Sequence, residues 1–366
     1  MTKVTRSLVP VILLVVSLGL LFAVLEGVTR VIASRDTNFI DRLASRHPPA
    51  GDGLSLGHII RVNANDRLVY ELLPGARGRF QGKDFSINAL GMRDRERRIE
   101  KTPVTYRILV LGDSHTFGWG VAQDEPYPAV LERLLNEAGA GCRFEVWNLG
   151  VPGYNTVMEV ERFATVADAW APDMVVINYV QNDMDLPNFL AVRPDPWDPR
   201  RSYLLEMVKR RAKILLGRDI SAWGLVGADA DRSGRYLFTP DKVPERWRSL
   251  AGWENMTGAY RRLSRLASER GIPALLLFNW DDYSARLAGK TDDARPRSVR
   301  DLAAEMGAGG FVVVDVQERV IRHLTANGLH APAVWISAND THTNTLRHRL
   351  VAEELRDRIL SLASCR

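Results

Sequence analysis

A serine, a histidine and a carboxylate in this chain could together carry out acyl transfer. Ser114 lies in the stretch Arg107–His115, where the apolar run Ile108–Leu111 leads into Gly-Asp-Ser-His. A serine hydroxyl is a weak nucleophile at neutral pH and needs an adjacent base, which is usually a histidine. A carboxylate commonly fixes the tautomer of that histidine and stabilises the cation that it becomes. Asp340 and His342 share one short segment near the carboxyl terminus, and they are the candidate orienting carboxylate and base.

The oxyanion of a tetrahedral intermediate also needs hydrogen-bond donors. Suitable groups are the backbone N–H of Ser114, the backbone N–H of Gly150 and the side-chain amide of Asn182. Glycine lets the backbone approach a ligand closely. Removal of one oxyanion donor typically lowers turnover ~100- to 1,000-fold. We therefore expect these three residues to form an oxyanion hole beside the candidate nucleophile.

Alternating strands and helices would bring these residues to one edge of a sheet. Short apolar runs predict strands at 107–111, 145–148, 174–179, 274–278 and 311–314. Apolar residues at helical spacing predict helices at 126–138, 158–170, 257–270, 296–306 and 344–362. This alternation indicates an α/β fold with a parallel five-stranded sheet covered on both faces. We expect the first strand to end in a tight glycine turn, an exposed Ser114 and a loop. Gly150 and Asn182 follow the next two strands, and the carboxyl ends of parallel strands share an edge.

Four short sequence blocks resemble those of the SGNH hydrolase (GDSL esterase) superfamily. They are Gly112-Asp113-Ser114, Asn148-Leu149-Gly150, Gln181-Asn182-Asp183, and Asp340 with His342. The resemblance runs in order over about residues 106–362. It implies a flavodoxin-like three-layer α/β/α sandwich that needs no metal or organic cofactor. It also implies that Ser114 is the nucleophile, that His342 is the base, and that Ser114, Gly150 and Asn182 form the oxyanion hole.

The last block departs from the usual spacing of this superfamily. The widespread form places Asp three residues before His, and Pro follows the His. In this chain Asn339 stands three residues before His342, Asp340 stands two before it, and Thr343 replaces the Pro. We assign the orienting role to Asp340 and keep Asn339 as the alternative.

An apolar segment near the amino terminus predicts a membrane anchor. Leu8–Leu25 carries no charge, follows Lys3 and Arg6, and ends at Glu26. Its length is close to the ~20 residues that span a bilayer as a helix. The basic flank favours a cytoplasmic amino terminus and a translocated remainder. We expect a single-pass signal anchor in the cell membrane, with the catalytic domain on the periplasmic side. A cleaved signal peptide and a buried core helix are the alternatives.

Changes in residue composition along the chain suggest three parts. Residues 1–26 would be a cytoplasmic stub and the transmembrane anchor, and residues 27–105 a spacer with a small β-rich lead-in. Residues 106–366 would form the hydrolase domain, with an insert at 187–253 that contains a helix at 203–216. The tryptophans of this insert could stack on sugar rings or pack in the core: Trp197, Trp223, Trp247 and Trp253.

Bulk composition excludes several classes of protein. The chain has 366 residues, 46% of them hydrophobic and 25% charged, which excludes general disorder. The net charge of +5 is spread along the chain without a basic stripe and interleaved aromatics, so we expect no nucleic-acid partner. Cys142 and Cys365 form no metal-binding pattern. They are either two thiols or one disulfide.

Together these features predict a membrane-anchored serine esterase. The anchor and the lead-in resemble those of bacterial envelope members of the superfamily, which often act on acyl groups of surface polysaccharides. This resemblance implies an acyl ester substrate, most simply an acetyl ester, on a cell-envelope carbohydrate. Two alternatives keep the fold. A polysaccharide O-acyltransferase would use the same residues with a sugar hydroxyl in place of water. A catalytically weak binding or assembly protein of the envelope would have lost the chemistry.

Overall fold

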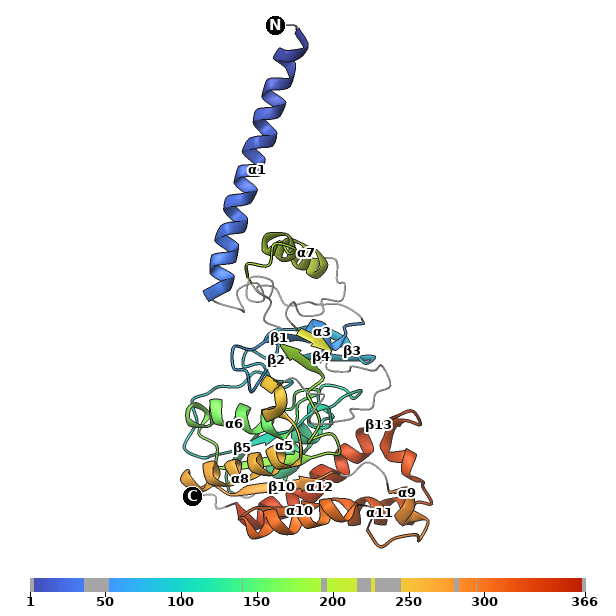
Figure 1. The fold of residues 1–366 in the computed structure, drawn as a ribbon. Helices are drawn as coiled ribbons and strands as arrows, with labels where there is room; N and C mark the ends of the chain where they lie inside the picture. The colour runs from blue at the N-terminus through green and yellow to red at the C-terminus, as the bar shows by residue number, and fades with distance from the viewer. Residues whose placement is uncertain are drawn as a thin grey trace.

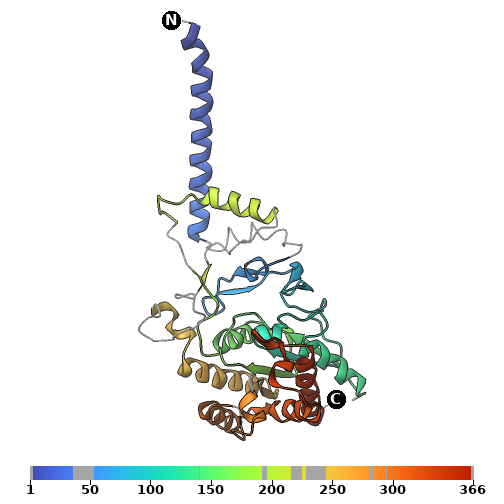
Figure 2. The same cartoon turned by 90° about the vertical axis from the view of Figure 1, so that its right-hand side faces the viewer.

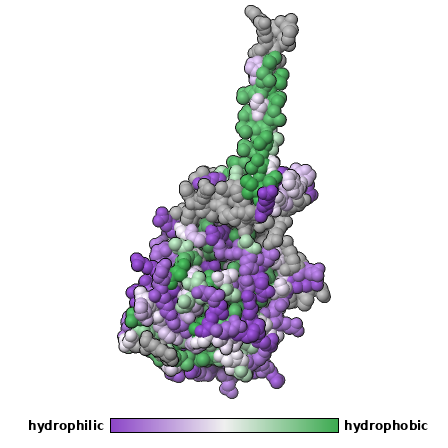
Figure 3. Space-filling view, turned by 90° about the vertical axis from the view of Figure 1, so that its left-hand side faces the viewer, coloured by the Kyte–Doolittle hydropathy of each residue, from purple (hydrophilic) through white to green (hydrophobic). Residues whose placement is uncertain are grey.

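The computed structural model describes residues 3–35, 53–139, 141–191, 196–215, 225–227, 245–279, 283–293 and 295–363. A long helix, α1 (Lys3–Arg35), stands apart from a folded body (Figure 1). Its apolar stretch is covered by no other part of the described chain, and it is long and apolar enough to cross a membrane. In Figure 3 this stretch is a hydrophobic column above a largely hydrophilic surface. The helix continues nine residues past Glu26, to Arg35.

The body is built on one parallel sheet of five strands. They are β5 (Thr105–Leu111), β6 (Arg143–Asn148), β7 (Met174–Tyr179), β10 (Ala274–Phe278) and β11 (Val312–Asp315). The order across the sheet is β11-β10-β7-β5-β6, and every pair is parallel. Each residue of β5, β7 and β10 is buried, as expected for strands covered on both faces. This is the flavodoxin-like strand order, and the predicted fold class is confirmed.

Helices cover both faces of this sheet. One group comprises α5 (Tyr127–Glu137), α11 (Gln317–Ala326) and α12 (Thr345–Leu362), with α12 contacting the other two. The second group comprises α6 (Thr156–Trp170), α8 (Trp253–Glu269) and α10 (Arg297–Ala308), with α8 contacting the other two. Helix α11 was not expected from the sequence, because it is short and has few apolar residues. The domain also contains a one-turn helix, α9 (Ser284–Leu287).

The lead-in is β-rich, as predicted. It contains a short helix α3 (Leu56–Ile59) and the strands β1 (Ile60–Val62), β2 (Tyr70–Leu72), β3 (Arg77–Phe80) and β4 (Lys83–Ser86). These strands form two antiparallel pairs, β1 with β2 and β3 with β4. Buried side chains of both pairs, such as Tyr70 and Phe80, belong to the same hydrophobic core as the sheet. The lead-in is therefore packed on the main domain rather than tethered to it.

The insert has parts that pack in the core of the body and a helix that contacts α1. It contains the antiparallel strands β8 (Phe189–Ala191) and β9 (Leu225–Gly227), the helix α7 (Tyr203–Leu215) and the 3-10 helix η2 (Glu245–Leu250). Helix α7 contacts α1 (Figure 2). Trp247 is buried and Trp253 packs against the core, whereas Trp197 is 59% exposed. Trp223 lies outside the described residues.

Cys142 is disulfide-bonded. The only other cysteine of the chain is Cys365, which lies outside the described residues. The disulfide alternative is thus the one that the structure supports for Cys142.

Candidate active site

Ser114 follows the sharp turn at the carboxyl end of β5. A side chain on Gly112 would place its Cβ 2.0 Å from Thr116 Oγ1, so only glycine fits this turn. Ser114 then begins a helical turn, α4 (Ser114–Phe117), whose first free amides are capped by Asp113. The backbone N–H of His115 donates to that carboxylate at 2.9 Å. The sequence predicted an exposed serine followed by a loop; this was wrong, because the helical turn leaves Ser114 only 8% exposed.

The carboxyl-terminal segment delivers Asp340 and His342 to Ser114. Both lie on β13 (Asp340–Thr343), which forms an antiparallel pair with β12 (Trp335–Ser337) after the 3-10 helix η3 (Ala331–Val334). Residues two apart on a strand point to the same face. His342 Nε2 lies 2.9 Å from Ser114 Oγ, and His342 Nδ1 lies 2.5 Å from an Asp340 carboxylate oxygen.

Asp340, and not Asn339, contacts the imidazole of His342. The same Asp340 oxygen also accepts the backbone N–H of His342 at 3.1 Å. The backbone N–H of Asn339 donates instead to Ser337 Oγ at 3.3 Å. Burial raises the pKa of the Asp340 carboxyl, but the hydrogen bonds from the side chain and backbone of His342 outweigh burial and hold that pKa below its usual value. Asp340 is therefore a carboxylate at neutral pH.

The imidazole of His342 is enclosed by two further rings. His115 stacks at a centroid distance of 4.9 Å and Trp119 at 5.1 Å, with interplanar angles of 26° and 16°. The Trp119 side chain also hydrogen-bonds the Asp340 carboxylate. Burial lowers the pKa of His115 well below its usual value, and the nearby charge of His342 lowers it further. His115 is thus neutral, and its Nδ1 lies 2.9 Å from Thr343 Oγ1.

Gly150 and Asn182 both lie against the turn that carries Ser114, and the expected oxyanion donors of both residues already have protein acceptors. The Gly150 N–H donates to Asn148 Oδ1 at 2.9 Å. The Asn182 side-chain amide lies 3.5 Å from Asp113 Oδ2, which is itself 3.2 Å from Ser114 Oγ. Gly150 packs directly on α4, because a Cβ there would lie 2.3 Å from the Phe117 backbone nitrogen.

A sequence comparison decides the family. Residues 110–350 match the GDSL-like Lipase/Acylhydrolase family. The chain is a member of this family. Enzymes of this family hydrolyse ester bonds, so this GDSL-like protein is an ester hydrolase. It matches none of the curated proteins with which it was compared.

Several solved structures resemble this GDSL-like hydrolase. A lipase/acylhydrolase from Enterococcus faecalis is 15% identical, with a TM-score of 0.39 over 71% of this chain and 98% of that one. An α/β hydrolase from the metagenome of Lake Arreo is 18% identical, with a TM-score of 0.40 over 71% and 97%. A catalytic mutant of an acetylxylan esterase from Geobacillus stearothermophilus is 18% identical, with a TM-score of 0.40 over 69% and 94%.

Arg93, in the lead-in, supports the nucleophile loop of the GDSL-like hydrolase. Its buried guanidinium donates to the carbonyls of Gly118, Val121 (2.6 Å) and Phe117 (3.3 Å). Burial lowers its pKa to about 10, so it stays charged at neutral pH. This role was not expected from the sequence. The shortest contacts of the guanidinium are with backbone carbonyls, which every residue type provides.

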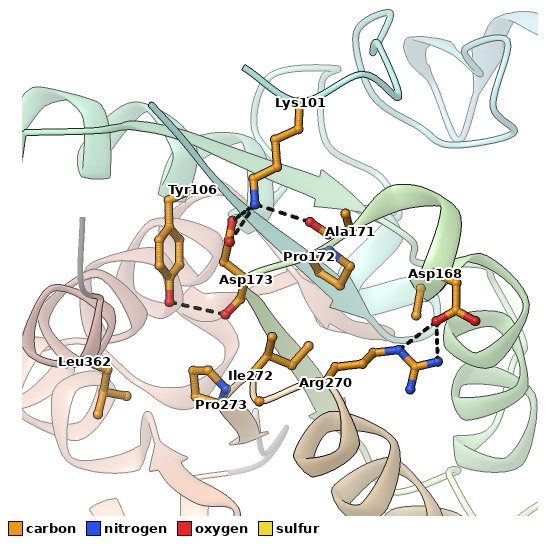
Figure 4. Close-up of a pocket in the computed structure, with 12 residues that line it drawn as sticks. Lys101, Tyr106, Asp168, Ala171, Pro172, Asp173, Arg270, Ile272, Pro273 and Leu362 are labelled. Atoms are coloured by element: carbon orange, nitrogen blue, oxygen red, sulfur yellow. Dashed lines mark hydrogen bonds and ion pairs between the residues drawn. The ribbon is translucent and has the colours of Figure 1, made fainter. Parts of the chain in front are cut away.

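A hollow of about 690 Å³ lies at the opposite edge of the sheet (Figure 4). Its lining includes residues next to the amino ends of β5 and β7, such as Tyr106 and Asp173. Asp173 is paired with Lys101 at 2.5 Å, and Arg270 is paired with Asp168 at 2.6 Å. The polar residues here neutralise one another, and ligands of such sheets bind at the carboxyl edge. The candidate active site is therefore the Ser114 region.

Proposed function

We propose that this hydrolase is a serine esterase in which Ser114 is the nucleophile, His342 the general base and Asp340 the orienting carboxylate. One observation carries the proposal: Ser114 Oγ, the two ring nitrogens of His342 and the Asp340 carboxylate form an unbroken chain of 2.9 Å and 2.5 Å contacts. A base must lie within ~2.6–3.2 Å of the proton that it removes. The continuous contact disfavours a binding protein that has lost its chemistry.

The reaction would follow from these contacts. Ser114 Oγ attacks the ester carbonyl while its proton passes to His342 Nε2. The bond to the alcohol breaks as His342 returns that proton to the leaving oxygen. Water then attacks the acyl-enzyme, again giving a proton to His342. The carboxylic acid leaves and Ser114 regains its proton. Asp340 stabilises the imidazolium in both halves.

The oxyanion would bind to the backbone N–H of Ser114, the backbone N–H of Gly150 and the amide of Asn182. The Gly150 N–H already donates to Asn148, so the substrate oxygen would compete with the Asn148 side chain. A charged oxyanion is the stronger acceptor, because charge-assisted hydrogen bonds are about twice as strong as neutral ones. We expect Asn182→Ala to lower kcat ~100- to 1,000-fold.

We propose that α1 is a retained anchor rather than a cleaved signal peptide. The Glu26 carboxylate accepts the backbone N–H groups of Tyr203 (3.0 Å) and Leu204 (2.9 Å), and the hydroxyl of Ser202 (2.9 Å). The first amides of a helix have no partner within it. Glu26 supplies that partner for α7, so cleavage after the apolar segment would leave those amides without it.

The substrate that we propose is an acetyl or other acyl ester of a cell-envelope carbohydrate. The apolar helix and its basic flank favour a domain held on the outer side of the cell membrane. The disulfide at Cys142 supports this location, because disulfides persist in oxidising compartments. An envelope carbohydrate would then be within reach of the anchored site.

Covalent labelling tests the chemistry. A fluorophosphonate should modify Ser114, and Ser114→Ala should lose both the adduct and the hydrolysis of aryl acetates. Absence of an adduct in the wild-type protein would overturn the proposal in favour of the binding role. Product analysis with and without an added polysaccharide separates release of free acid from transfer to a sugar. Intact mass of the membrane-extracted protein tests whether α1 is retained, and thiol alkylation without reductant should leave Cys142 unlabelled.

A further inference from the structure

Helix α7 lies across the foot of the apolar segment of α1. The two helices are in contact, and α7 runs crosswise to α1 in Figure 2. Glu26, the first charged residue after the apolar run, holds the amino end of α7. Leu8–Leu25 measures about 27 Å as a helix, close to the ~30 Å of a hydrocarbon core. If that run spans a bilayer, α7 begins at the depth where the hydrocarbon ends, and it runs along the surface.

Arg30, one turn further along α1, holds the loop before α7. Its guanidinium donates to the carbonyls of Pro196 (2.7 Å) and Asp198 (3.1 Å), on either side of Trp197. The same group lies 5.7 Å from the ring centroid of Tyr203, the buried first residue of α7. The loop and the helix are thus both fixed to the part of α1 that directly follows its apolar run.

Among the described residues, an apolar side of helix α7 is exposed. Leu205 is 45% exposed and Val208 is 54% exposed, and Ala212, one turn later, is also exposed. These positions share one side of a helix because they are three and four residues apart. Trp197 adds an aromatic ring that is 59% exposed. An apolar helix side beside an exposed tryptophan is typical of segments that sit in the interfacial layer of a membrane.

The same segment is strongly basic. Residues 196–215 contain six basic and two acidic residues, a net charge of +4. The described side chains include the exposed Arg201 and Lys209, the latter with 55% of its side chain accessible. Basic segments next to a membrane-spanning helix bind anionic headgroups. The positive charge and the exposed apolar side of this segment therefore both indicate a membrane surface as its partner.

We propose that α7 and Trp197 form a lipid-binding surface on the leaflet from which α1 emerges. The apolar side of α7 enters the headgroup–acyl boundary, and its basic residues contact anionic headgroups. This inference rests on the proposed retention of α1 as an anchor. The domain is then attached at two places instead of one, so it cannot rotate freely about α1. Because the body is fixed to this surface, the distance between the active site and the bilayer is fixed as well.

A fluorophore at Val208 tests the inference in the full-length protein. Val208→Cys would be labelled with an environment-sensitive NBD group, while the disulfide at Cys142 remains unreactive. The matched control is Val104→Cys, because Val104 is similarly exposed at 60%. Val104 directly precedes β5, whose second residue, Tyr106, lines the same hollow as Leu362. Leu362 ends α12 next to the carboxyl terminus, which lies remote from α1 (Figure 1). Each protein is reconstituted in vesicles of phosphatidylcholine, with or without phosphatidylglycerol, that carry a shallow doxyl quencher.

We expect the quencher to remove roughly half or more of the emission at Val208 and almost none at Val104, because interfacial helices lie about 5–10 Å into the boundary. Phosphatidylglycerol should increase the quenching at Val208, and high salt should reverse that increase. Equal quenching at both positions in protein that floats with the vesicles overturns the inference alone. Protein that does not float overturns the anchor as well. If the unlabelled Val208→Cys protein crosslinks between two copies and the labelled protein is not quenched, the partner of α7 is a second copy of the chain. That result would also overturn the inference. Hydrolysis of a soluble aryl acetate, measured in parallel, tests the esterase separately.

Discussion

The indole of Trp119 lies nearly parallel to the imidazole of His342, with ring centroids 5.1 Å apart, and it hydrogen-bonds the Asp340 carboxylate that contacts the same imidazole. One side chain therefore constrains both the base and its orienting partner. The His115 ring also stacks on the imidazole of His342, at a centroid distance of 4.9 Å. The two ring contacts and the Asp340 hydrogen bond together restrict rotation of the imidazole, whose Nε2 lies 2.9 Å from Ser114 Oγ.

Trp119 substitutions separate the stacking from the hydrogen bond. Trp119→Phe keeps an aromatic ring but removes the donor, and we expect kcat to fall about 5- to 10-fold, the effect of ~1 kcal/mol. Trp119→Ala removes both contacts and should lower kcat further. Because the lost donor stabilises the carboxylate, the pKa of Asp340 should rise. Equal kcat in the wild-type and Ala proteins would contradict this role.

Asp340 and its neighbour form a matched pair for testing the orienting role. Asp340→Asn should lower kcat ~10²- to 10⁴-fold, because an amide does not stabilise the imidazolium and permits the wrong tautomer. Asn339→Ala should leave kcat unchanged, since Asn339 does not contact the ring in this structure. Steady-state hydrolysis of an aryl acetate measures both. The reverse ranking would return the orienting role to Asn339.

Arg93 should matter for stability and for activity. Arg93→Met leaves the buried carbonyls of Gly118 and Val121 without their donor, and each such loss costs ~1–3 kcal/mol. We expect the free energy of unfolding to fall by about 2–4 kcal/mol, with a lower kcat in the protein that remains folded. The control is Arg95→Met, which removes a half-exposed ion pair with Glu132 and should cost ~1 kcal/mol or less. Chemical denaturation distinguishes the two.

Glu159 and Glu161, both on α6, should make the stability of the fold change with pH in opposite directions. Glu159 is fully buried, and within the described chain its carboxyl oxygens have no hydrogen-bond partner. Burial and then the charge of Asp183 raise its pKa well above the usual value, so native Glu159 keeps its proton while the unfolded chain releases it above pH ~4. The wild-type protein loses stability as pH rises from there. Glu159→Gln should therefore raise Tm at neutral pH, and the gain should disappear near pH 4.

Glu161 provides the comparison of opposite sign. Burial raises its pKa, but hydrogen bonds from Arg262 and Asn65 outweigh burial and lower it overall. Its stabilisation is present above the pKa of the unfolded chain and is lost as pH falls through the folded pKa. Glu161→Gln should lower Tm at pH 7, with a smaller difference at acid pH. Thermal melts of both variants across pH test the pair, and shifts of the same sign in both would contradict the assignment.

The fold was predictable because its strands are short continuous apolar runs. The predicted bounds of β7 and β10 coincide with the observed ones, and those of β5 and β6 differ by two residues at their amino ends. Helix α11 escaped prediction because it is short and weakly apolar. The turn of helix that begins at Ser114 escaped because four residues carry no periodic signal.

The candidate site was predictable in part for a similar reason. Ser114, Gly150 and Asn182 each follow an apolar strand, so their convergence follows from the topology of a parallel sheet. Trp119 and Arg93 could not be assigned in this way. The Trp119 ring meets a histidine more than two hundred residues away, and Arg93 binds backbone carbonyls, to which any residue type contributes equally.

The two-residue spacing brings Asp340 and His342 together because both lie on the extended strand β13. Along a strand, insertion or deletion of a single residue turns everything beyond it to the opposite side of the sheet. A one-residue change between Asp340 and His342 would therefore separate acid from base completely instead of shifting them slightly.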